Sequence, residues 1–208
     1  MKTILKSFEL KLKYPRSRKT RILIQKQKIR EEVKRKRHSL GLLKKISLNK
    51  KIRANLENLQ DFKNAKTILI YTSMKDEVDT LKIIKKHFKE KRLILPTVCK
   101  DSNTLKLYHL ENLKELKKGY QGILEIPHCT KNTTLPSEIE LCIIPGLAFD
   151  LNGNRIGYGK GFFDSLLKNI HAKKIALAYD FQIYETLPCH EDDVPINSII
   201  TESQIINI

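Results

Sequence analysis

The sequence predicts an α/β fold: a three-layer single domain with a largely parallel sheet and helices on both of its faces. Short apolar runs rich in β-branched residues alternate along the chain with segments of helical composition, the pattern of parallel strands joined by crossover helices. The chain has 208 residues, of which 40% are apolar and 30% charged. That length and composition are typical of one sizeable globular domain.

The N-terminal part predicts an extension followed by two helices. Residues 1–23 contain Pro15 and a polar basic run without a strong period, so we expect a basic N-terminal extension and a domain that spans residues 24–208. The composition of residues 24–37 suits a helix, with Ile29 and Val33 four residues apart. A second helix is predicted from Ser47, as N-cap, to about residue 59.

The rest of the chain predicts alternating strands and helices. Helices are expected from Asp79 or Thr80, shortly before Gly119, and from Gly161 to about Ile170, and residues 127–138 are expected to form a loop. Pro96 is expected to end the second strand. The predicted strands are Thr67–Tyr71, Arg92–Leu95, Leu105–Leu110, Leu141–Ile144, Lys174–Tyr179 and Ser198–Thr201.

The positive charge is concentrated at one end of the chain. Residues 1–53 contain 20 of the 40 Lys and Arg residues but only three of the 23 acidic residues, so the whole net charge of +17 lies there and the remainder is neutral. Such a segment can bind nucleic acid, an anionic surface or a polyphosphate ligand. It can equally be a solvated helix face with a loose tail.

The N-terminal residues, the lengths of the apolar runs and the spacing of the cysteines favour a cytoplasmic protein. No apolar run approaches the roughly 18 residues of a membrane span, so we expect no membrane association. Lysines interrupt the apolar residues at the N-terminus, which argues against a secretory signal, whereas a mitochondrial-type transit peptide stays open. The four cysteines are widely spaced without a CxxC pair, which favours reduced thiols over a zinc site or disulfide framework.

The segment that points to chemistry runs from residue 144 to 164. Gly157, Gly159 and Gly161 alternate with larger residues, and glycine lets the backbone turn tightly and present several N–H groups to one anion. Arg155 and Lys160 add positive charge, so the stretch fits a phosphate cradle, although such loops are often simple tight turns. Its spacing is neither that of a Walker A loop nor that of a dinucleotide fingerprint.

The string Pro-Gly-Leu-Ala-Phe-Asp, followed by Gly-Asn-Arg-Ile-Gly-Tyr-Gly-Lys-Gly-Phe-Phe-Asp, resembles the signature of the 5-formyltetrahydrofolate cyclo-ligase family. Three other segments, at residues 26–37, 71–80 and 176–202, agree in order and spacing. The resemblance covers about residues 24–208. It implies a ligase that converts 5-formyltetrahydrofolate and ATP into 5,10-methenyltetrahydrofolate, ADP and phosphate in the presence of Mg²⁺, through a phosphorylated formyl group.

The resemblance also implies roles for individual residues. Lys26 and Arg30 would contact ATP, although without it a solvated basic helix face would be the simpler interpretation. Arg155 and Lys160 would be catalytic. The whole glycine-rich stretch would bind ATP, namely Arg155, Ile156, Gly157, Tyr158, Gly159, Lys160, Gly161, Phe162 and Phe163.

The resemblance also implies which residues bind the folate and the metal. Glu77 would bind the folate, with Thr72 and Tyr158 as further contacts, and Asp164 and Asp193 would hold Mg²⁺. Without the resemblance, the simpler interpretation of Glu77 is an exposed loop acid, and that of Asp164 is a residue that stabilises a helix dipole. Two positions depart from the family pattern: Tyr158 stands where some members have Arg, and Asn197 where Asp is common.

Two competing functions remain open from the sequence. The basic segment could belong to a nucleic-acid-binding module, but it matches no RNA-recognition motif and has few aromatic residues, so we do not expect nucleic acid to be a partner. A different ATP-dependent enzyme, such as a kinase, is the second alternative. We expect a monomer whose partners are ATP and 5-formyltetrahydrofolate.

Overall fold

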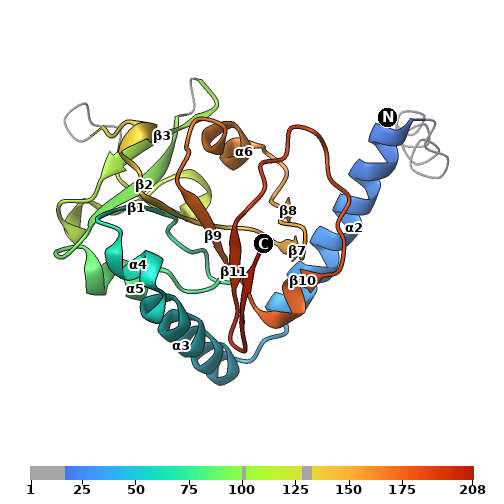
Figure 1. The fold of residues 1–208 in the computed structure, drawn as a ribbon, viewed down its shortest axis with the longest axis horizontal. Coiled ribbons are helices and arrows are strands. Elements are labelled where there is room, and N and C mark those ends of the chain that lie inside the picture. The colour runs from blue at the N-terminus through green and yellow to red at the C-terminus, as the bar shows by residue number, and fades with distance from the viewer. Residues whose placement is uncertain (1–16, 100–101, 128–132) are drawn as a thin grey trace.

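The structure, a computed structural model, describes residues 17–99, 102–127 and 133–208. A seven-stranded sheet forms its centre, with five parallel strands flanked by antiparallel edge strands at both ends (Figure 1). The predicted fold class is therefore confirmed. The strand order is β12 (Ile205–Asn207), β11 (Ser198–Ile200), β9 (Lys173–Leu177), β6 (Leu141–Ile144), β1 (Thr67–Ile70), β2 (Arg92–Cys99) and β3 (Thr104–His109).

Helices cover both faces of this sheet. On one face, helices α3 (Leu42–Asn58), α4 (Gln60–Asn64) and α5 (Leu81–His87) share a core with strand residues such as Ile68 and Ile70. On the other face, α6 (Phe162–Leu167) packs in the core that contains Leu69 (Figure 1). Successive residues of β1 thus enter opposite cores, as expected for a strand that is buried on both faces.

The first described helix, α2 (Arg18–His38), packs on a second, smaller sheet. That sheet consists of β7 (Ala148–Asp150), β8 (Arg155–Ile156) and β10 (Ile183–Tyr184), and it was not predicted. Val33 on α2 is fully buried and packs among Leu147, Ala148, Ile156 and Leu187. The helix is thereby held beside the glycine-rich stretch that follows β8.

Both N-terminal helices begin earlier than the sequence predicted. The side chain of Ser17 caps α2 by accepting a hydrogen bond from the amide of Thr20, so residues 18–23 are helical. Helix α3 begins at Leu42 after Gly41, which makes Ser47 an interior residue and the predicted N-cap wrong. The missed residues at the start of α3 are helix-favouring Leu and Lys, but Leu42 and Leu43 are exposed and show no buried stripe.

Two further expectations about local structure were wrong. Strand β2 continues through Pro96 to Cys99. Pro96 lies beyond the last residue of β2 that pairs with β1, and from there on β2 pairs with β3 alone, so proline is tolerated at this position. The helix expected before Gly119 is only the 3-10 turn η1 (Leu113–Glu115). Further short elements surround it: β4 (Lys117–Lys118), η2 (Tyr120–Gly122), β5 (Leu124–Glu125) and η3 (Pro136–Glu138), with η4 (Asp180–Gln182) later in the chain.

Cys142 and Cys189 are free thiols, and Cys129 lies outside the described residues, so the predicted reduced state of the four cysteines stays a prediction. Within the described ranges, no helix is both long and apolar enough to cross a membrane. Residues 1–16, the larger part of the predicted extension, are also outside the described chain.

Candidate functional site

A cavity of about 410 Å³ lies where the parallel strands β1 and β6 end. This is the edge at which open α/β sheets place their ligands. Helix α2 borders it on one side, and the hairpin of β2 and β3 borders it through Pro96, Val98 and Leu105. Every site residue predicted from the sequence lines it: Lys26, Arg30, Thr72, Glu77, Arg155, Ile156, Gly157, Tyr158, Gly159, Lys160, Gly161, Phe162, Phe163, Asp164 and Asp193.

The turn before the glycine-rich stretch is fixed by Asp150, which is fully buried. Its carboxylate accepts hydrogen bonds from the amides of Asn152 and Asn154 at 3.0 and 2.8 Å, and from the amide of Leu187 at 2.8 Å. Gly153 completes the turn with a positive φ of 84°. A buried carboxylate that is hydrogen-bonded this fully stabilises the hairpin, and the hairpin sets the direction in which Arg155 leaves it.

The glycine-rich loop lies against α2. Its residue Gly159 has a φ of 99°, which L-residues rarely adopt, and a Cβ atom there would approach the guanidinium carbon of Arg30 to 3.4 Å. The Nε of Arg30 donates a 2.8 Å hydrogen bond to the carbonyl of Gly157. Lys160 at the tip of the loop is exposed. The two segments predicted to contact ATP are therefore in direct contact with each other.

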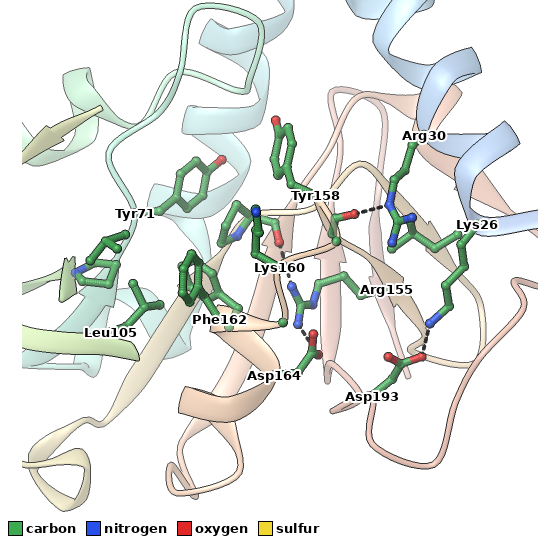
Figure 2. Close-up of a pocket in the computed structure, with 18 of the residues that line it drawn as sticks. Lys26, Arg30, Tyr71, Leu105, Arg155, Tyr158, Lys160, Phe162, Asp164 and Asp193 are labelled. Carbon is green, nitrogen blue, oxygen red and sulfur yellow. Dashed lines mark hydrogen bonds and ion pairs between the residues drawn. The ribbon is translucent and has the colours of Figure 1, made fainter. Parts of the chain in front are cut away.

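Two cation–carboxylate pairs lie side by side in the cavity (Figure 2). Lys26 donates a hydrogen bond to Asp193, and Arg155 donates one of 2.6 Å to Asp164. Burial lowers the pKa of Arg155, and the two carboxylates of Asp164 and Asp193 oppose this effect. Burial also lowers the pKa of Arg30, again opposed by Asp193. Both predicted metal ligands thus face one space together with three cations.

Glu77 occupies a different environment, with only 4% of its surface exposed. One carboxylate oxygen accepts the hydroxyl proton of Tyr158 at 2.9 Å, and the other accepts the amide of Met74 at 2.8 Å. Burial raises the pKa of Glu77, whereas the Met74 amide, Arg37 and the Tyr158 hydroxyl act against this rise. Nearby, the hydroxyl of Thr72 donates to the carbonyl of Leu124.

Some cavity residues were missed by reasoning from the sequence. Lys19, Ile22 and Leu23 line the cavity from the first two turns of α2, which were assigned to the extension. Their helical spacing on the face of Lys26 is a signal that could have found them. His190, which was given no role from the sequence, also lines the cavity. Asn197 does not line it, since it exchanges hydrogen bonds with the backbone of Lys174 on β9.

The fold and the cavity define a parallel α/β protein with a strand-end ligand site that combines a glycine-rich loop, cations and carboxylates. The sequence profile of the 5-formyltetrahydrofolate cyclo-ligase family matches residues 23–202. The chain is 30% identical to 5-formyltetrahydrofolate cyclo-ligase from Mus musculus, over 85% of this chain and 93% of the mouse protein. It is 34% identical to the enzyme of that name from Escherichia coli K12, over 68% of this chain and 80% of that one.

Solved structures agree with the sequence relatives. The 5,10-methenyltetrahydrofolate synthetase from Aquifex aeolicus superposes with a TM-score of 0.79 at 35% identity, covering 88% of this chain and 92% of that protein. The synthetase from Mycoplasma pneumoniae gives a TM-score of 0.66 at 26% identity, covering 85% and 98%. The chain therefore belongs to the 5-formyltetrahydrofolate cyclo-ligase family, a family of enzymes that the sequence resemblance had identified.

Proposed function

We propose that the protein converts 5-formyltetrahydrofolate into 5,10-methenyltetrahydrofolate and that ATP and Mg²⁺ are required for the reaction. The single observation that carries the proposal is the shared cavity, in which the glycine-rich loop, the two cation–carboxylate pairs and the buried Glu77 meet. Family membership supports the folate substrate and product. The predicted cytoplasmic location and monomeric state stay predictions.

The chemistry explains why such an enzyme uses ATP. The formyl group on the ring nitrogen is an amide, and its oxygen is a poor leaving group. Transfer of the γ-phosphoryl group breaks the bond to ADP and joins phosphorus to the formyl oxygen, which gives an iminium phosphate. The neighbouring arylamine nitrogen then attacks the formyl carbon and loses its proton. The carbon–oxygen bond breaks, and phosphate leaves with the oxygen.

The residues at the charged end of the cavity fit the demands of phosphoryl transfer, which are mainly positioning and charge stabilisation. In our proposal, Lys26 and Arg30 hold the polyphosphate on one face of α2. Arg155 and Lys160 stabilise the charge that develops on the transferred group. Donors of this kind typically contribute about 2.7–4 kcal/mol each to transition-state stabilisation.

The donor set also fits a magnesium ion that is shared with nucleotide phosphates. Mg²⁺ prefers oxygen ligands, and in nucleotide sites it commonly takes one or two protein carboxylates together with phosphate oxygens. Asp164 and Asp193 supply two carboxylates in one cavity. When bound there, Mg²⁺ would neutralise part of the phosphate charge. Lys26 and Arg155, which pair with these carboxylates here, would then be free to turn toward the phosphates.

At the other end of the cavity, we assign the pterin to Glu77. The amino group and ring N–H of a pterin are donors, and a buried carboxylate is a strong acceptor for them. Thr72 and Tyr158, which line the same cavity, would complete the folate contacts.

An absorbance assay for methenyltetrahydrofolate tests the proposal. The purified protein is expected to form this product from 5-formyltetrahydrofolate only when ATP and Mg²⁺ are both present, so each is omitted in turn. Folded protein that forms no product in the complete mixture would refute the assignment. Product formation without ATP would refute the phosphorylated intermediate.

A further inference from the structure

Arg37, a residue without an assigned role, lies behind the folate end of the cavity. It is in the last turn of α2, and only 3% of its surface is exposed. One terminal nitrogen donates a 3.0 Å hydrogen bond to the hydroxyl oxygen of Tyr158, and the other donates to the carbonyl of Gly146. Its Nε has no hydrogen-bond partner among the described atoms. A guanidinium this buried and incompletely paired needs an explanation.

The directions of the hydrogen bonds around Tyr158 explain why Arg37 is buried here. A hydroxyl group has one proton, and here it is donated to Glu77 at 2.9 Å. The same oxygen accepts from Arg37. Arg37, Tyr158 and Glu77 therefore form a relay that runs from a fixed cation through a hydroxyl to a carboxylate. The second oxygen of Glu77 accepts from the amide of Met74, so both oxygens act as acceptors, which suits the ionised form.

The other groups that face Glu77 do not replace Arg37. Lys45 on α3 is the second cation nearby, but its own pKa is lowered by burial, and Asp76 lies 3.9 Å from it. Tyr71 and Tyr179 add neutral hydroxyls, and that of Tyr179 lies 3.0 Å from the side-chain oxygen of Asn49 and 3.3 Å from the backbone carbonyl of Glu77, so its one proton serves these acceptors. The carboxylate of Asp79 accepts hydrogen bonds from the amides of Leu81 and Lys82 at the start of α5. Among the residues that the structure describes, Arg37 is the cation that reaches Glu77 through a hydrogen-bonded path.

We propose that Arg37 is a positioning residue for folate binding, which keeps Glu77 aimed and ionised through the hydroxyl of Tyr158. This inference rests on the proposed function, since it assumes that Glu77 binds the folate. Removal of the Arg37 charge leaves burial less opposed, so the pKa of Glu77 rises further. Because protonated Glu77 is a weaker acceptor than the carboxylate, folate binding then weakens near neutral pH and recovers as the pH rises.

The test measures the dissociation constant of 5-formyltetrahydrofolate from pH 6 to 9, with a nonhydrolysable ATP analogue present. Arg37→Met is expected to weaken binding about tenfold at pH 7, because a protonated Glu77 can no longer make a charge-assisted hydrogen bond to the folate. The loss should shrink steadily toward pH 9. Arg37→Lys, which keeps the charge, should lie between this variant and the wild type. Arg35→Met removes the same charge from the same turn at an exposed position and should change nothing.

Each outcome decides the inference. A loss of the same size at every pH means that Arg37 is merely structural and overturns it, and so does an unchanged dissociation constant. If Arg37→Met does not fold, as judged by circular dichroism, Arg37→Lys and Tyr158→Phe carry the test. Tyr158→Phe breaks the relay and also removes a proposed folate contact, so its loss should recover toward high pH only in part, and a loss without any recovery overturns the inference. A wild type that binds no folate overturns the proposed function as well, whereas failure of the variants alone leaves it standing.

Discussion

The two ends of the cavity solve the problem of buried charge differently. At the nucleotide end (Lys26, Arg30, Arg155, Asp164 and Asp193), each carboxylate pairs directly with a cation. At the folate end (Glu77, Tyr158 and Thr72), no cation touches the carboxylate among the described residues. Glu77 instead accepts hydrogen bonds from the Tyr158 hydroxyl and from the backbone amide of Met74. The first arrangement holds charges that can exchange partners, whereas the second holds one acceptor in place.

This difference fits the two ligands that we propose. A nucleotide with its metal brings both negative and positive charge, and paired groups can re-pair with it without leaving a charge uncompensated. A pterin brings mainly N–H donors, for which a fixed and desolvated acceptor is the better match. Changes at the nucleotide end should therefore act on turnover, and changes at the folate end on folate affinity.

The largest effect is expected from Lys160→Ala. The variant removes an exposed cation from the tip of the glycine-rich loop, and turnover should fall roughly a hundredfold or more because one charge-stabilising donor is lost. Steady-state kinetics measure it. The control is Lys114→Ala, which removes an exposed lysine away from the cavity. A rate equal to that of the wild type would place the phosphate cradle elsewhere.

The next largest effect is expected from Glu77→Gln. The amide oxygen can still accept from the Met74 amide, so the change removes charge with little loss of volume. Charge-assisted hydrogen bonds contribute about 1.5–3 kcal/mol each, so the folate dissociation constant should rise about tenfold to a few hundredfold. Paired titrations with folate and a nonhydrolysable ATP analogue check it. Equal losses of affinity for both ligands would contradict the separation of a nucleotide end from a folate end. Loss of affinity for the ATP analogue alone would show that Glu77 belongs to the nucleotide end.

The smallest effect concerns the start of α2. Removal of residues 1–16 leaves Ser17 and the helix intact, and the dissociation constant of an ATP analogue should stay unchanged. Removal of residues 1–23 also deletes the cap and the cavity-lining Lys19, Ile22 and Leu23. That should weaken binding about fivefold, the effect of roughly 1 kcal/mol for a lost cap. Equal affinities for the two truncated proteins would show that the first two turns do not contribute to the nucleotide end.

The parallel core was predictable because its strands carry short apolar β-branched runs with a clear signal. The predicted site residues were also found together, since Glu77 and the glycine-rich loop both follow strands that end at one edge of the sheet. The roles assigned to them remain predictions. Both segments follow a parallel strand in the sequence, and this position alone predicts that they lie close together.

Other features had no local signal. Strands of two or three residues, such as β8 and β10, are too short to show a period, and they form because α2 packs over them. The cap at Ser17 was hidden in a uniformly basic stretch. The relay from Arg37 to Glu77 joins residues 40 positions apart through Tyr158, 81 positions beyond Glu77, and no spacing rule links such residues.

The central claim is that ATP cleavage and folate cyclisation are one reaction in this cavity. The most direct measurement follows phosphate release and methenyltetrahydrofolate formation in the same sample, with and without 5-formyltetrahydrofolate. We expect one phosphate for each product molecule and no release above background when the folate is absent. Phosphate release that continues without the folate would indicate a different ATP-dependent enzyme and contradict the account.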